Sequence, residues 1–236
     1  MEAEGQIAGA SPRESSQGKE PVPTLSALRR FAGARSKTDA ERCELCATAL
    51  NDNHPHLLNR ASRQIACACD ACAILFCGQE GANFLRVPRR ILKPMSFRFT
   101  DAEWDSMTLP INLAFFLRQP NGETAALYPS PAGVMESMIE LPPWDELFAG
   151  QPTLLGIEPE VEALLVNRIG VASGRESPSD THAAFIVPID AAYRLVGLIR
   201  TKWRGLSGGH EVWQAIADFF AALERQAVPV GEAAHA

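Results

Sequence analysis

The arrangement of apolar and polar residues predicts a long amphipathic helix near the C-terminal end of the chain. After the turn sequence Ser207-Gly208-Gly209, apolar residues recur at spacings of three and four. That spacing places them on one face of a helix, as expected for a helix that packs on a core. The residues of this face are Val212, Ile216, Phe219, Phe220 and Leu223.

Shorter apolar runs bounded by turn residues predict strands. Residues 112–117 and 124–128 flank Asn121-Gly122, a dipeptide typical of β-hairpin turns. Residues 162–169 and 183–187 are two more apolar runs of strand length. Together these runs predict a mostly antiparallel sheet.

Three further segments have the features of helices. Residues 101–107 and 143–149 are helix candidates, and Pro143 stands at an early helical position, where proline is tolerated. Asp190 is a candidate N-cap for a helix that runs to about Trp203. With the strands, these helices predict the α+β fold class, with helices packed on one side of the sheet.

The chain divides into four predicted segments. Residues 1–38 are rich in Gly, Ser, Glu, Lys and Pro, which predicts a disordered arm. Residues 39–80 contain all the cysteines, residues 81–228 form the α+β domain, and residues 229–236 form a flexible tail. Within the domain, residues 170–182 are rich in Gly, Ser, Pro and Asp and predict a loop.

Composition and charge restrict the kinds of protein to which the chain can belong. Hydrophobic residues make up 46% of the chain and charged residues 21%, as in globular proteins that bury a core. The formal net charge of −6 disfavours nucleic acid as a partner. No apolar run approaches the roughly 18 residues of a membrane span, and no export signal is visible. We therefore expect a cytoplasmic protein.

The cysteines carry the clearest chemical signal in the sequence. Cys43-Glu-Leu-Cys46 and Cys69-Asp-Ala-Cys72 are two Cys-x2-Cys pairs, and no cysteine occurs outside residues 43–77. Clustered cysteines in a reducing compartment are more often metal ligands than disulfides. Four thiolates suit tetrahedral Zn²⁺ and leave no open position for catalysis. We expect zinc at these four cysteines, with iron as the main alternative.

The surroundings of the two pairs resemble a treble-clef zinc finger. The first pair sits in a turn, residues 56–59 and 64–67 can form a hairpin, and Cys69 opens a helical stretch that reaches Phe76. The positive end of the helix dipole would stabilise thiolates placed there. The segment departs from many such fingers because no glycine follows either pair.

Other residues near the pairs have less specific signals. Cys67 and Cys77 can each replace one of the four cysteine ligands, although packing in the core is the simpler role for both. His56 can serve as an alternative metal ligand or can hydrogen-bond one of the ligands. His54 and His56 also raise the alternative of a His-Asn-His-type nuclease, which shares the treble-clef frame. The helix after Cys72 would then have to supply a metal-binding histidine, and it contains none.

Two stretches without acidic residues are candidates for partner binding. Arg89 and Arg90 belong to a basic stretch over residues 81–99, and Arg204 belongs to a second one. A solvated face is the simpler explanation of these charges, and an acidic protein surface is the alternative that their local positive charge would suit. Trp203 and Arg204 precede the glycine-rich turn, and tryptophan and arginine often anchor interfaces.

A broader resemblance covers about residues 41–226. It rests on the cysteine pairs and on several segments that accompany them, which are Val187-Pro-Ile-Asp190, Tyr128-Pro-Ser-Pro-Ala-Gly133 and Trp203-Arg-Gly-Leu-Ser-Gly-Gly209. In these the chain is similar to an uncharacterised bacterial family encoded beside high-affinity nickel–iron hydrogenase genes. The resemblance implies an accessory role in assembling or supporting the hydrogenase, with a hydrogenase subunit or maturation factor as partner.

The remaining motifs do not supply a nucleophile, a base and an oxyanion hole together. A non-catalytic zinc-binding accessory protein is therefore favoured, and the question of an enzymatic activity stays open. The alternative from another class is a rubredoxin-like electron carrier with one iron bound by the four cysteines.

Overall fold

The computed structural model describes residues 41–79, 81–169 and 183–231. These residues belong to one compact unit, Ala40–Ala236. The predicted arm at residues 1–38 and the predicted loop at residues 170–182 lie outside the described residues. No helix in the described ranges is long and apolar enough to cross a bilayer.

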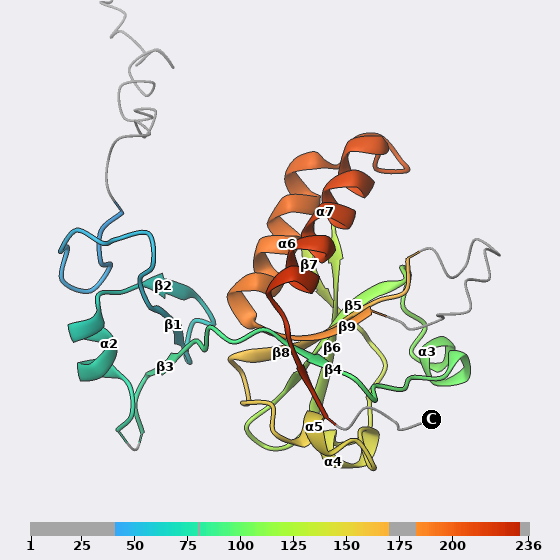
Figure 1. The fold of residues 1–236 in the computed structure, drawn as a ribbon, viewed down its shortest axis with the longest axis horizontal. Helices are drawn as coiled ribbons and strands as arrows, with labels where there is room; N and C mark the ends of the chain where they lie inside the picture. The colour runs from blue at the N-terminus through green and yellow to red at the C-terminus, as the bar shows by residue number, and fades with distance from the viewer. Residues whose placement is uncertain (1–40, 80, 170–182, 232–236) are drawn as a thin grey trace, which may run out of the picture. The chain divides into compact units, whose positions relative to one another are not determined.

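A seven-stranded sheet forms the centre of the α+β fold (Figure 1). Its strand order is β10-β4-β9-β8-β5-β6-β7, and all neighbours are antiparallel except β10 and β4. The strands are β4 (Leu92–Pro94), β5 (Leu113–Arg118), β6 (Thr124–Ser130), β7 (Gly133–Glu136), β8 (Glu162–Asn167), β9 (Ala183–Pro188) and β10 (Val228–Val230). The prediction of a mostly antiparallel sheet is confirmed.

The predicted hairpin joins β5 and β6, which are neighbours in the large sheet. Phe116 pairs with Ala126, and the Gln119 backbone N–H donates to the Glu123 carbonyl oxygen at 2.9 Å. Gly122 has a φ of 88° in the connecting turn, a conformation that glycine adopts without steric cost. The turn chemistry therefore sets the register of these two strands.

Helices cover both faces of this sheet, so the expectation of helices on one side is wrong. The long helices α6 (Ile189–Lys202) and α7 (His210–Gln226) pack on one face. The short helices α3 (Asp101–Ser106), α4 (Trp144–Leu147) and α5 (Pro152–Leu155) supply residues to the core on the other face. The aromatic residues buried in this second core are Phe99, Trp104, Phe116, Trp144 and Phe148.

The central strands have a continuous apolar sequence because both of their faces are covered. In β5, Phe115 contacts the core beneath α6 and α7, whereas its neighbour Phe116 enters the opposite core. Both side chains are almost completely buried. Successive side chains of a strand point to opposite faces, so two buried faces require apolar residues at every position.

Helix α6 begins differently from the sequence prediction. Pro188 occupies its N-cap position, no side chain caps it, and Asp190 lies inside the first turn. A carboxylate there still interacts favourably with the helix dipole. By contrast, α3 has a capping box between Thr100 and Glu103, so its predicted start agrees with the structure.

The cysteine-containing segment forms a second, smaller sheet with one helix. Its strand order is β2-β1-β3, and the strands are β1 (His56–Asn59), β2 (Ile65–Cys67) and β3 (Phe84–Arg86). Helix α2 (Asp70–Phe76) follows β2 directly. We call residues 41–86 the knuckle; hairpin β1–β2 and α2 give it the treble-clef-like arrangement that the sequence predicted.

The knuckle contacts the α+β domain through apolar and charged residues. Leu58 of β1, and Val87 directly after the knuckle, are part of the core that lies beneath α6 and α7. Arg63 hydrogen-bonds the buried Glu160, and Arg60 Nε lies 3.3 Å from the other oxygen of that carboxylate. A buried carboxylate needs such partners, so this ion pair ties the turn of the β1–β2 hairpin to the large sheet.

Candidate metal centre

The first cysteine pair lies in a tight turn that precedes β1. A bridge between Arg42 and Ala49 closes this turn, and the Cys43 backbone N–H donates to the Thr48 carbonyl oxygen at 2.8 Å. Ala47 has a φ of 61°, in the left-handed region. It therefore adopts the conformation that a glycine after the second cysteine would adopt at no steric cost.

The second pair lies at the start of α2. Cys69 is the N-cap residue of this helix, and its Sγ accepts a hydrogen bond from the Cys72 backbone N–H at 3.4 Å. The first N–H groups of a helix have no partner within the helix and favour negative charge. The position of the pair is thus suited to thiolates.

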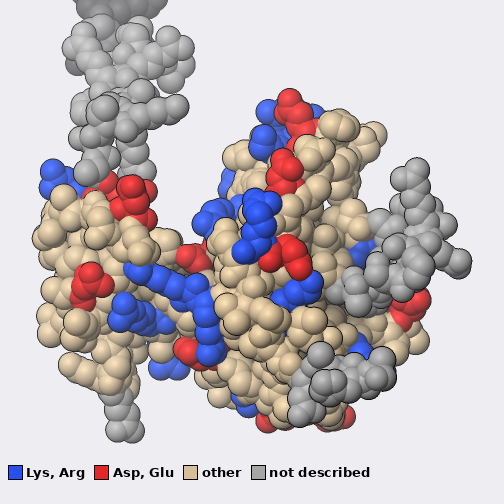
Figure 2. Space-filling view, viewed as in Figure 1, with Lys and Arg blue, Asp and Glu red and all other residues tan. Residues whose placement is uncertain are grey.

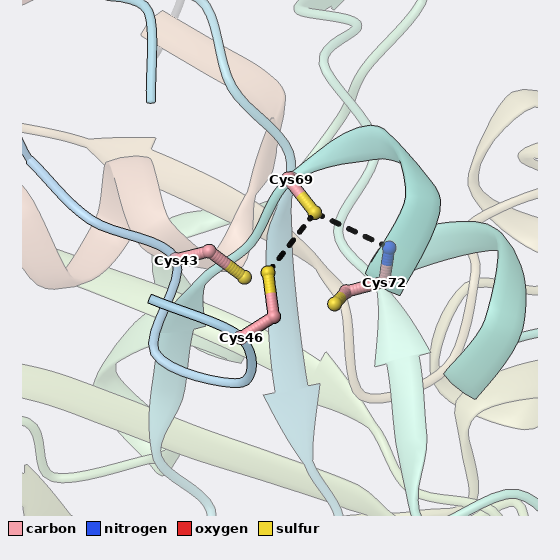
Figure 3. A group of neighbouring side chains, drawn as sticks. All are labelled: Cys43, Cys46, Cys69 and Cys72. Atoms are coloured by element: carbon pink, nitrogen blue, oxygen red, sulfur yellow. Dashed lines mark hydrogen bonds between the residues drawn. The ribbon is translucent and has the colours of Figure 1, made fainter. Parts of the chain in front are cut away.

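The four sulfur atoms come together at one point. All four lie within 4.8 Å of one another, and Sγ of Cys46 is 3.6 Å from Sγ of Cys69. In Figure 3 the four side chains point toward a common centre from the turn and from the helix. Two sulfurs of a tetrahedral zinc site with bonds of about 2.3 Å are roughly 3.8 Å apart. The donor set and its spacing therefore fit a bound metal ion.

The thiols differ in acidity because their surroundings differ. Burial raises the pKa of Cys43, but hydrogen bonds with the backbone of Cys69, Leu45 and Cys46 outweigh it and lower this pKa to about 6. For Cys72, burial and then the neighbouring sulfurs raise the pKa to about 12. Several thiolates cannot accumulate side by side without a cation, and a metal ion would supply the positive charge.

The predicted cysteine cluster is therefore present, and it could hold a metal ion. All six cysteines are unpaired thiols. Cys77 ends α2, and Cys67 lies at the end of β2; among the described residues neither belongs to the four-sulfur cluster. Burial raises the pKa of both, and for Cys67 the carboxylates of Glu41 and Glu44 add to this effect.

Arg89 and Arg90 have different surroundings. Arg90 makes two hydrogen bonds, of 2.6 and 2.7 Å, with the two oxygens of the fully buried Glu162 carboxylate. This contact raises the pKa of Arg90. Arg89 is exposed and donates to the Asn53 carbonyl oxygen at 3.1 Å. Figure 2 shows that Asp and Glu side chains lie among the Lys and Arg side chains of the viewed face.

Trp203 and Arg204 lie at the end of α6, where the chain turns toward α7. Trp203 is partly buried, and its indole N–H donates to the Gly205 carbonyl oxygen at 2.9 Å. A Cβ atom added to Gly208 would lie 3.2 Å from the Trp203 ring, so the glycine allows the turn to pack closely. Arg204 and Leu206 are exposed in this turn.

An apolar cavity of about 490 Å³ lies beside this turn. Trp203, Trp213 and Ile216 line it from the helical side, and Ile111 and Tyr128 line it from the side of the sheet. The rings of Trp203 and Trp213 meet edge to face, with centroids 6.0 Å apart. Such a cavity can accept an apolar side chain.

Several residues of these sites have little or no local sequence signal. Glu160, Glu162 and Asp190 become important only because they meet Arg63, Arg90 and His56, which lie far away in the sequence. A single acidic residue in an apolar run, such as Glu162 at the start of β8, is the one hint of a buried ion pair.

Comparison with known proteins identifies the family. The model of a family of unknown function, DUF5947, matches residues 42–227, which is more than half of the chain. The chain belongs to this family. The match covers the knuckle and the α+β domain together, so both are features of the family. No curated protein and no solved structure matches the chain significantly.

Proposed function

We propose that this DUF5947 protein is a non-catalytic accessory protein that binds Zn²⁺ at Cys43, Cys46, Cys69 and Cys72 and acts through contacts with another protein. The observation that carries the proposal is the closed cluster of four sulfurs. Four protein ligands complete a tetrahedral shell and leave no position for a substrate. The role of the ion is then to hold the knuckle in the shape that a partner recognises.

We propose a subunit or maturation factor of a nickel–iron hydrogenase as the partner. Support comes from the resemblance of the sequence to proteins encoded beside such hydrogenases. The docking element is the last turn of α6 together with the turn that follows it, where Leu206 is fully exposed and Arg200, Lys202 and Arg204 are exposed cations. These residues suit an acidic segment of the partner that places an apolar side chain in the neighbouring cavity.

Two measurements test the metal and the partner separately. Metal analysis of protein purified without oxygen should find zinc, and a stoichiometric visible absorption from iron would support the electron-carrier alternative instead. Deletion of the gene should lower hydrogenase activity or leave the large subunit immature. Full hydrogenase activity in the deletion strain, under conditions that require the enzyme, would contradict the hydrogenase role.

The docking element needs variants that leave the fold intact. Arg204→Ala combined with Leu206→Ser should reproduce part of the deletion phenotype, because both side chains are exposed. Trp203→Ala is less suitable, since its ring packs on Gly208 and on the core. Arg225→Ala, an exposed arginine at the end of α7, is the matched control and should behave as the wild type.

A further inference from the structure

Three possible metal ligands lie next to the four-sulfur cluster without belonging to it. The ligand atoms of His54, His56 and Cys67 are all within 4.8 Å of one another. His56 and Cys67 face each other across the β1–β2 pair, which brings such side chains into contact. His54 precedes β1 by two residues, and its ring meets that of His56 edge to face at a centroid distance of 5.0 Å.

We propose that His54, His56 and Cys67 form a second metal site for a borderline divalent transition-metal ion such as Zn²⁺ or Co²⁺. Two imidazoles and one thiolate are a donor set that these ions accept readily. Three protein ligands leave the fourth tetrahedral position open to water or another small ligand. The site thus differs in kind from the closed cluster and goes beyond the proposed accessory role.

The strongest evidence is the buried ring of His54. Its side chain is only 7% exposed, and Nδ1 lies 2.8 Å from the Asn51 carbonyl oxygen. A carbonyl oxygen only accepts, so Nδ1 donates to it, and Nε2 is the ring nitrogen that remains available to a metal ion. Among the described residues no group hydrogen-bonds Nε2, and Glu41 Oε2 is 3.6 Å away, too far for such a bond. A metal ion would satisfy this buried acceptor.

His56 is oriented in the way that is usual for a metal-binding histidine. Its Nδ1 lies 2.6 Å from Oδ2 of Asp190. Metal-ligating histidines commonly donate one ring N–H to a carboxylate, which fixes the ring and makes the other nitrogen a better ligand. Because Asp190 occupies Nδ1, Nε2 of His56 is the nitrogen left for a metal. The same contact connects the knuckle to α6.

Two carboxylates lie near the proposed site. The Cys67 backbone N–H donates to Glu44 Oε1 at 2.9 Å, and the exposed carboxylate of Glu41 adjoins His54. Their negative charge attracts a cation to the group. The Cys67 carbonyl oxygen also accepts from the Glu44 N–H at 2.9 Å. This hydrogen bond links the turn that carries the first cysteine pair to the strand that carries the third ligand of the proposed second site.

Counting metal ions in the full-length protein tests the proposal. Protein that is reduced, loaded with Zn²⁺ and freed of excess metal should retain two ions per chain. His54→Ala and Cys67→Ala should each retain one. Cys77→Ala and His210→Ala are the matched controls and should retain two, because neither residue belongs to either group. One ion in the wild type, or two in His54→Ala, would overturn the proposal.

Spectroscopy of Co²⁺ distinguishes a specific second site from a loosely bound ion. The second equivalent of Co²⁺ should add a thiolate-to-metal absorption band that Cys67→Ala lacks and Cys77→Ala keeps. Asp190→Asn should keep the band but weaken binding of the second ion roughly 10- to 100-fold, since it disturbs the orientation of His56. A second equivalent that gives no thiolate band, or binding that Asp190→Asn leaves unchanged, would contradict the proposed site. His54→Ala decides the stoichiometry even if Cys67→Ala fails to fold.

Discussion

At the scale of single residues, Ala47 follows the first cysteine pair at a position where many treble-clef zinc fingers have a glycine. Its φ of 61° is strained for alanine, by roughly 1–2 kcal/mol. Ala47→Gly should remove this strain while adding freedom to the unfolded chain, for a net stabilisation of up to about 1 kcal/mol. Chemical denaturation of the metal-loaded protein measures the change. Ala61→Gly, in an exposed turn with ordinary φ, should instead be slightly destabilising, and equal effects of the two would contradict the argument.

Substitutions of the neighbours Arg90 and Arg89 should have very different effects on stability. Arg90→Ala leaves the buried carboxylate of Glu162 without its cation, which should cost on the order of 2–4 kcal/mol. The value lies below that of fully buried pairs because Arg90 is 44% exposed. Arg89→Ala should change stability by less than about 0.5 kcal/mol. Urea denaturation checks both, and recovery of stability in Arg90→Leu with Glu162→Leu would confirm the cause.

At the scale of elements, α2 depends on the metal site at its start. A helix of seven residues is too short to be stable alone, and most of its outer face is exposed, including Ile74 and Leu75. Metal binding should therefore supply much of the folding free energy of the knuckle, on the order of 10 kcal/mol.

Cys43→Ser tests this dependence of α2. The variant should lose the metal, and hydrogen exchange should show that the amides of α2 lose protection while those of β8 and β9 keep it. Proteolysis should then begin within residues 41–86. Cys77→Ser is the control, because Cys77 lies outside the four-sulfur cluster. Unchanged protection of α2 in the metal-free variant would contradict a role of the metal in folding.

At the scale of the whole molecule, the metal affinity of the knuckle should depend on pH. At pH 7 Cys43, with a pKa of about 6, is mostly a thiolate, whereas Cys72, with a pKa of about 12, is a thiol. Zinc binds only thiolates, so binding must release at least the Cys72 proton, and affinity should rise with pH. Below about pH 6 Cys43 also takes up a proton, so the affinity should fall more steeply there.

Calorimetry in buffers of different ionisation enthalpy measures this proton release directly. A chelator at pH 5 should remove the ion more completely than the same chelator at pH 8. The seven-stranded sheet should remain folded after removal, since its two cores are made of residues outside the cysteine cluster. Zinc affinity that does not change between pH 5 and pH 8 would contradict the assignment of thiolate ligands.

The sequence by itself determined the features that depend on neighbouring residues. The Cys-x2-Cys pairs, the Asn121-Gly122 hairpin and the apolar face of α7 each lie within one short segment. Backbone geometry and side-chain spacing over a few residues are enough to specify such features. They led to the α+β fold class and to the four-sulfur cluster, which the structure contains.

Only the tertiary structure decided which distant residues meet. The pairs Arg90–Glu162, Arg63–Glu160 and His56–Asp190 join positions 72, 97 and 134 residues apart. Apart from the single acid at the start of the apolar run of β8, nothing local distinguishes their members, so the sequence indicated a surface cation at Arg90 and a helix cap at Asp190. The sequence also predicted helices near α3 and α4 but not the face of the sheet that they cover, because that depends on the core that their buried residues join.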